Sequence, residues 1–193
     1  DSRLNNRILD YCKTNRITPN FFALEFNKTN YVSYNFKFCE FIMENILKQY
    51  FPHYLNNNFN SQMQDIQIPG RMEIFQKEPL IIFDIAHNAD AIEYLLRSVR
   101  NNYPNIGFNF LLSVLKDKDM EKILAILQAC DFVKKILYYE GKDFLASPVS
   151  HFEIDVLNET TLAKFLKKEK TPLIIAGSFR LYPIVTKILS DEI

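Results

Sequence analysis

Residues 68–88 of this chain read I-P-G-R-M-E-I-F-Q-K-E-P-L-I-I-F-D-I-A-H-N. A Pro-Gly-Arg turn precedes a short strand expected at residues 72–75, and a second strand expected at 79–83 ends just before Asp84 and a helix. In open α/β sheets, ligands bind at the carboxyl ends of the strands. The stretch therefore predicts both the architecture and the edge of the sheet at which a site should lie.

Outward from this stretch, apolar runs and helical patterns alternate to the end of the chain. Strands are expected at residues 80–83, 107–113, 133–139, 152–156 and 172–176, and helices at 90–101, 118–129, 159–168 and 179–190. Strands that are apolar throughout, such as 80–83 and 173–176, are typical of sheets covered by helices on both faces. With right-handed crossovers, residues 66–193 are predicted to form an α/β domain, a three-layer αβα Rossmann-like fold with a mostly parallel sheet.

Residues 1–65 have a different composition, rich in Asn and Phe and with few β-branched runs. Helices are expected at 4–14 and 36–50, and a short strand at 23–26. Residues 54–65 are predicted to be a loop or short helix that leads to the domain boundary, where a hinge would fit. This part is expected to be a small, mainly helical unit.

The overall composition excludes several classes of protein. Lys plus Arg and Asp plus Glu balance at 23 each in 193 residues, so the chain has no basic field for nucleic acid, which is not an expected partner. The three cysteines, Cys12, Cys39 and Cys130, have neither disulfide nor zinc-ligand spacing. No apolar run approaches the roughly 18 to 20 residues that span a bilayer, and no signal-peptide pattern is present. We expect no membrane partner and a cytoplasmic location.

Polar residues follow three of the predicted strands, and their loops should share one sheet edge. They are Asp84, His87 and Asn88 after the first strand, the Lys-Asp-Lys-Asp run 116–119 after the second, and Gly177 and Ser178 after the last. Helix amino termini at this edge offer free N–H groups to an anion. Purely structural roles are the alternative to ligand binding. Each of Asp84, Asn88, Asp117 and Asp119 can cap a helix, and Arg71 can be a surface arginine in a turn.

Four motifs in order carry a family resemblance: Pro69-Gly70-Arg71, Asp84-Ile85-Ala86-His87-Asn88, Asp117-Lys118-Asp119 and Gly177-Ser178. Together they resemble the carboxyl-terminal domain of folylpolyglutamate synthase, including its bifunctional dihydrofolate synthase form, in the Mur-ligase superfamily. The resemblance covers residues 66–193, and more loosely a helix opened by Asn35. The chain departs from the family pattern at Ala89, where Pro is frequent, and at Ser113 or Val114, where Gly is usual.

The resemblance implies ATP-dependent addition of L-glutamate to dihydropteroate, to a reduced folate carrying a polyglutamate tail, or to both, through an acyl phosphate. A cell-wall precursor ligase and a non-catalytic nucleotide-binding module are the alternatives, and the spacing of the first two motifs favours the folate enzymes. No G-x-x-x-x-G-K-[ST] loop occurs in the chain. We therefore expect a carboxyl-terminal fragment that is inactive alone, with residues 1–65 a remnant of an amino-terminal ATPase domain, and a monomeric full-length enzyme.

The resemblance also assigns roles to single residues. Arg71 and His87 are expected to be catalytic, with Arg71 supporting the transferred phosphoryl group as a second domain closes. Asn35, Arg71 and Asp84 are expected to bind ATP. His87, Lys118 and Ser178 are expected on the glutamate side. Mg²⁺ is an expected cofactor whose ligands lie outside this chain, which itself is expected to hold no metal.

Overall fold

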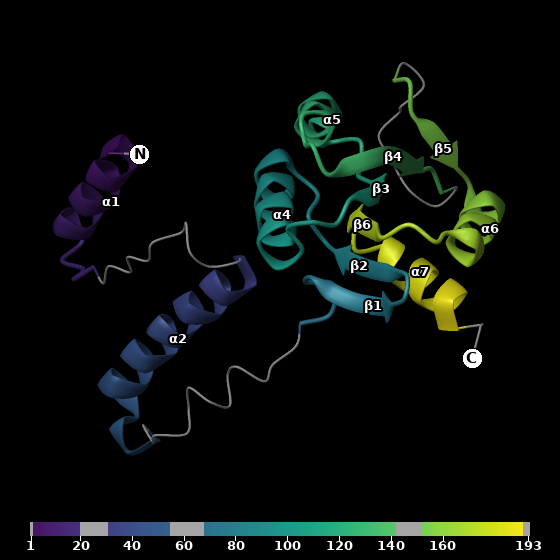
Figure 1. Cartoon of the computed structure of the whole chain (residues 1–193). Coiled ribbons are helices and arrows are strands. Elements are labelled where there is room, and N and C mark those ends of the chain that lie inside the picture. Colours follow the sequence, from purple (N-terminus) through teal and green to yellow (C-terminus); the bar gives the residue numbers. More distant parts are fainter. Residues whose placement is uncertain (1, 20–30, 55–67, 142–151, 191–193) are drawn as a thin grey trace.

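A computed structural model describes residues 2–19, 31–54, 68–141 and 152–190 of the chain (Figure 1). The helices are α1 (Ser2–Thr14), α2 (Tyr31–Tyr50), the 3₁₀ turn η2 (Pro52–Tyr54), α4 (Ala89–Asn102), α5 (Met120–Gln128), α6 (Glu159–Lys168) and α7 (Leu181–Ser190). The strands are β1 (Glu73–Lys77), β2 (Leu80–Asp84), β3 (Phe108–Ser113), β4 (Val133–Tyr139), β5 (Asp155–Leu157) and β6 (Leu173–Gly177).

The described strands form one mixed sheet in the order β1-β2-β6-β3-β4-β5. Strand β1 pairs antiparallel with β2, whereas every other neighbouring pair is parallel. The last strand in sequence, β6, thus lies between β2 and β3. The predicted mostly parallel sheet is confirmed.

Helices cover both faces of the sheet, as Figure 1 shows, with α4 and α5 on one side and α6 and α7 on the other. Alternate residues of β2 face the two sides of the sheet. Ile82 packs in a core with Ile92 and Leu95 of α4. Ile81 and Phe83 pack in a second core on the opposite face, with residues of α6 and α7. A strand covered on both faces has no polar side, which explains its unbroken apolar run. The three-layer αβα prediction is confirmed.

The observed bounds differ from the predicted ones by a few residues, for local reasons. Helix α5 begins at Met120 rather than 118, because the Asp119 side chain accepts a hydrogen bond from the Lys122 N–H and caps the helix. Strand β5 covers Asp155–Leu157 rather than 152–156. The expected strand at 23–26 and most of the expected 54–65 loop lie outside the described residues, so the domain boundary near residue 65 stays a prediction.

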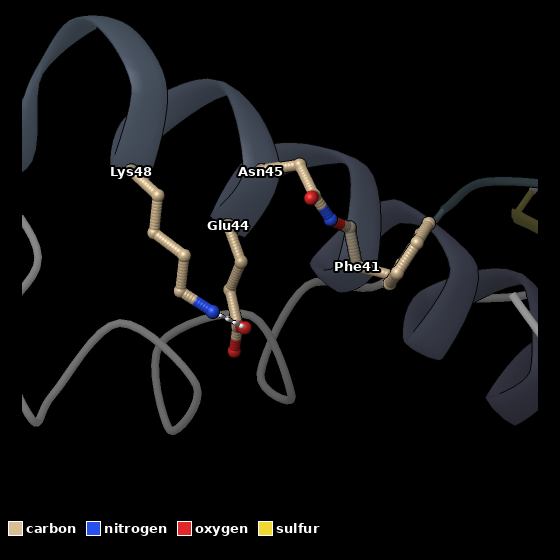
Figure 2. Close-up of polar contacts among 4 residues, drawn as sticks. All are labelled: Phe41, Glu44, Asn45 and Lys48. Atoms are coloured by element: carbon tan, nitrogen blue, oxygen red, sulfur yellow. Dashed lines mark hydrogen bonds and ion pairs between the residues drawn. The ribbon is translucent and has the colours of Figure 1, made fainter. Parts of the chain in front are cut away.

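Helices α1 and α2 confirm the helices predicted in the first part, but their apolar side chains differ in burial from those of the sheet domain. Phe38, Ile42 and Ile46 of α2 are 40–43% exposed, whereas the aliphatic residues Ile92, Leu95, Leu96 and Val99 of α4 are buried. The polar contacts of α2 in Figure 2 are local ones: Lys48 pairs with Glu44 at 3.0 Å, and the Asn45 amide donates to the Phe41 carbonyl at 2.7 Å. Within the described ranges, no helix has the length and apolarity needed to cross a membrane.

Candidate functional site

The sheet brings the three predicted site loops to one edge. Asp84 at the end of β2 lies beside Ala176 of β6, and Ser113 at the end of β3 lies beside Gly177. Because β2, β6 and β3 are adjacent and parallel, the loops that follow them leave the sheet side by side. The shared edge predicted from the sequence is confirmed.

Gly177 lets the loop after β6 turn tightly across the end of β3. Its φ of +126° is disfavoured for residues with a side chain, and a Cβ there would lie 1.9 Å from the Ser113 carbonyl oxygen. The next N–H, that of Ser178, donates to the same oxygen at 2.7 Å. The Ser178 N–H is therefore used by the fold.

The Ser178 side chain is buried, and its hydroxyl oxygen accepts a 3.3 Å hydrogen bond from the Arg180 N–H. A hydroxyl can donate while it accepts. Ser178 can therefore offer its hydroxyl proton to an anion, whereas its backbone N–H is bonded to the Ser113 carbonyl.

Asp84 ties the Pro-Gly-Arg turn to the end of β2. Its side chain is 1% exposed, and one carboxylate oxygen accepts from the Met72 N–H at 2.9 Å while the other accepts from the Ala86 N–H at 2.8 Å. The alternative that Asp84 caps helix α4 is wrong, because Asn88 is the N-cap and accepts from the Ala91 N–H at 2.9 Å.

The turn that carries Arg71 has an unusual backbone on both sides of the arginine. Gly70 has φ +74° and Met72 has φ +47°. Positive φ is uncommon for a residue with a side chain, such as Met72. The Gly70 carbonyl accepts from the Ile85 N–H at 2.8 Å. Arg71, which is partly exposed, is thus presented from a turn that is bonded to the segment after β2.

His87 is exposed, and its ring orientation is set by a 2.8 Å hydrogen bond between Nδ1 and the Ile85 carbonyl. A carbonyl oxygen only accepts, so Nδ1 carries the proton in this bond. In the neutral ring Nε2 then keeps its lone pair and can accept a proton or a hydrogen bond.

Lys118 forms an ion pair with its neighbour Asp117 at 2.8 Å. The hydrogen bond from Lys118 is the main reason why the pKa of Asp117 lies below its ordinary value, with a smaller contribution from His87. Asp119 caps α5, so the alternative that this aspartate is a helix cap is confirmed.

Asn35 does not open its helix, because α2 begins at Tyr31. The expectation of a helix opened by Asn35 is therefore wrong, and because Asn35 lies inside α2 it does not cap this helix either. The position of the Asn35 side chain lies outside what the structure describes, so its ATP role stays a prediction.

Sequence reasoning missed Glu73 and Tyr182. One Glu73 carboxylate oxygen accepts from the Gly70 N–H at 2.7 Å, and the other accepts from the Tyr182 hydroxyl at 3.0 Å. The available signal was the glutamate two positions after Arg71, inside the short strand expected at residues 72–75. In the described parts of the chain, no group of three or more His, Cys, Asp or Glu side chains is placed to hold a metal ion.

Several known proteins are similar to this chain in sequence. Residues 70–148 match the family model described as Mur ligase, glutamate ligase domain. The dihydrofolate synthase/folylpolyglutamate synthase of Bacillus subtilis is 25% identical over 97 residues, which are 50% of this chain and 22% of that protein. Its Escherichia coli counterpart is 37% identical over 62 residues, which are 32% of this chain and 15% of that protein.

Solved structures show the same fold. Escherichia coli FolC in complex with ADP aligns with a TM-score of 0.60 and 21% identity over 72% of this chain and 36% of that one. The Yersinia pestis bifunctional folylpolyglutamate synthase/dihydrofolate synthase complexed with AMPPNP and Mn aligns with a TM-score of 0.55 and 22% identity over 72% and 35%. The aligned part of this chain thus spans about a third of the length of these structures.

Proposed function

We propose that the chain is the carboxyl-terminal part of an ATP-dependent folate ligase, because its residues 70–148 match the family model described as Mur ligase, glutamate ligase domain. The ligase adds L-glutamate to dihydropteroate, to a folylpolyglutamate, or to both, through an acyl phosphate. The observation that carries the proposal is the convergence of the Pro-Gly-Arg turn, the histidine loop, the Lys118 loop and the Gly-Ser turn around one end of the sheet.

Arg71 is the residue that we assign to the ATP phosphates. A fixed guanidinium stabilises charge on transferring phosphoryl oxygens without having to reorganise during the reaction. The turn supports this role, because Gly70 and Met72 on either side of Arg71 are each held by a carboxylate. ATP is the nucleotide of the proposal and Mg²⁺ its metal, with ligands outside the described residues.

His87 and Lys118 are assigned to the glutamate side. The exposed imidazole can receive a proton at Nε2, as attack by an amine on an acyl phosphate requires. Lys118 can bind a carboxylate if it exchanges Asp117 for the substrate, and both partners are at the surface, where such an exchange costs little. The Ser178 hydroxyl is assigned to the same carboxylate.

Asp84 supports the site chiefly through the turn. Its carboxylate is buried and accepts two backbone N–H groups, so it fixes the backbone next to Arg71. The ribose hydrogen bond expected from the resemblance would need a further lone pair of the same carboxylate, and it stays a prediction. A cytoplasmic location and a monomeric enzyme also stay predictions.

The test is an ATP-dependent ligation assay on the ligase that contains this chain, with glutamate and either dihydropteroate or a reduced folate. Arg71→Ala is expected to lower kcat by about 100-fold, as for the loss of one charge-stabilising donor. Arg97→Ala, which removes an exposed arginine of α4, is the matched control and should retain activity. Product from a cell-wall precursor and none from any pterin would contradict the folate assignment.

A further inference from the structure

The arginine turn and the Gly-Ser loop are joined by one hydrogen-bonded pair, Glu73 and Tyr182. These residues lie 109 positions apart, Glu73 at the start of β1 and Tyr182 in the first turn of α7. One oxygen of the Glu73 carboxylate bonds the Gly70 N–H and the other bonds the Tyr182 hydroxyl. The pair therefore connects the turn before β1 to the helix that follows the Ser178 loop.

The turn needs such support because its backbone is unfavourable. A residue other than glycine in the left-handed region costs of order 1 kcal/mol or more and persists only where surrounding contacts hold it. Here Glu73 accepts the N–H before Arg71, and Asp84 accepts the N–H after it. Two carboxylates thus hold the backbone N–H groups of the two residues that flank Arg71.

Tyr182 is held in place by an aromatic cluster. Its ring stacks on Phe179 with centroids 5.3 Å apart and meets Phe75 and Phe83 edge-on at 5.3 and 5.2 Å. Phe179 follows Ser178 directly, and its ring also lies against Gly70, 3.4 Å from where a Cβ would stand. The Gly-Ser loop and the arginine turn are therefore in contact through side chains as well as through the hydrogen bond.

The phenol is suited to act as a donor over a wide pH range. Burial, together with the hydrogen bond to Glu73 and its negative charge, raises the pKa of Tyr182 above its ordinary value. The hydroxyl stays protonated at neutral pH and donates to the Glu73 carboxylate.

We propose that Glu73 and Tyr182 are a positioning pair that sets the conformation of the Arg71 turn and couples it to the Ser178 loop. The proposal rests on the proposed function, in which Arg71 serves ATP and Ser178 serves glutamate. In this role Glu73 and Tyr182 bind the backbone and each other rather than a substrate. The pair acts through Arg71, so that the nucleotide side and the glutamate side of the site move as one unit.

The first experiment measures kcat and KM for ATP and for glutamate in the ligase that contains this chain. Glu73→Ala is expected to lower kcat/KM for ATP about tenfold, because a small displacement of a charge-stabilising group is costly. Glu73→Gln should recover most of the loss, since its amide oxygen can accept from Gly70 and its NH₂ can donate to the Tyr182 oxygen. Tyr182→Phe, which keeps the ring stack, should lose less than Glu73→Ala.

Combination with Arg71→Ala separates positioning from a general structural effect. If Glu73 acts through Arg71, Glu73→Ala should add no further loss in the Arg71→Ala background, because coupled residues are not additive. Glu93→Ala and Tyr94→Phe on α4 are the matched controls and should leave kcat/KM unchanged. Fully additive losses, or failure of Glu73→Gln to recover activity, would overturn the proposal.

Amide hydrogen exchange of this chain, measured by NMR, tests the role of Glu73 and Tyr182 in the turn without depending on ligase activity. Glu73→Ala should speed exchange of the Gly70 and Met72 amides by about tenfold or more, while Ile123 in α5 stays at the wild-type rate. Unchanged exchange in the turn would overturn the positioning role. If the wild-type enzyme adds no glutamate but Glu73→Ala still speeds exchange at Gly70 and Met72, the proposed function is rejected. The control of the turn by Glu73 and Tyr182 is then retained.

Discussion

The edge of the sheet at the carboxyl ends of the parallel strands and the edge at their amino ends each contain a glycine and a carboxylate that contact nearby groups. The two edges differ in how tightly these contacts hold the backbone. At the carboxyl edge, Gly177 faces a backbone oxygen, and Asp84 bonds two backbone N–H groups. At the amino edge, a Cβ on Gly107 would meet only the flexible end of Lys134, and Glu169, which also accepts two backbone N–H groups, is partly exposed rather than buried.

This difference matches the proposed position of the site, which lies at the carboxyl edge. The carboxyl edge presents Arg71, His87 and Ser178 from short backbone connections with positive φ at Gly70, Met72 and Gly177. Short contacts between backbone atoms leave little room for adjustment, whereas the ends of long side chains can move. A site that depends on fixed geometry is expected to lie at the first kind of edge.

The largest expected effect comes from the two glycines. Gly177→Ala should destabilise the domain by about 3 kcal/mol or more, because the new Cβ meets the Ser113 carbonyl and the φ is strained. Gly107→Ala should cost under about 1 kcal/mol, since the Lys134 side chain can move aside. Chemical denaturation of both variants measures the difference, and equal losses would remove the contrast between the edges.

The next effect concerns the two carboxylates. Asp84→Asn places an NH₂ group opposite one of the two backbone N–H groups that the carboxylate accepts, so a buried donor loses its acceptor at a cost of about 2 kcal/mol. Glu169→Gln should cost less, because that side chain is partly exposed. Denaturation midpoints at pH 7 compare the variants, and a larger loss for Glu169→Gln would reverse the ranking.

A smaller effect is expected at the two ends of helix α4, which runs from one edge to the other. Asn88→Ala removes the N-cap at the carboxyl edge and should cost about 1 kcal/mol. Asn102→Ala in the last turn of the same helix removes an exposed side chain and should change stability by no more than about 0.5 kcal/mol. Thermal unfolding of the pair tests this, and a neutral Asn88→Ala would argue against the cap.

The smallest effect is a change in pH dependence at the amino edge. Burial raises the pKa of Glu169, but hydrogen bonds from Thr171, Asn109 and Lys170 outweigh it and leave the pKa below its ordinary value of 4.5. A depressed pKa contributes stability that is present above 4.5 and is lost as the pH falls through the folded value. Glu169→Gln should therefore flatten the stability profile below about pH 4.5 and leave its slope near pH 7 unchanged, as measured by urea unfolding across this range.

The sequence by itself determined the elements of the sheet domain and the position of its motifs along the chain. Unbroken apolar runs such as Leu173–Gly177 indicate buried strands, and helical periodicity indicates the helices between them, because both patterns depend on residues close in sequence. The same local rules placed Asp84, Lys118 and Ser178 after strands, and thus at one edge.

Only the tertiary structure decided which groups at that edge contact each other. Insertion of β6 between β2 and β3 places Ser178 near the arginine turn, and the fold joins Glu73 to Tyr182 across 109 positions. It also made Asn88 rather than Asp84 the cap of α4. Strand order and long-range hydrogen bonds depend on how whole elements pack, and a local pattern of residues carries no record of its distant partner.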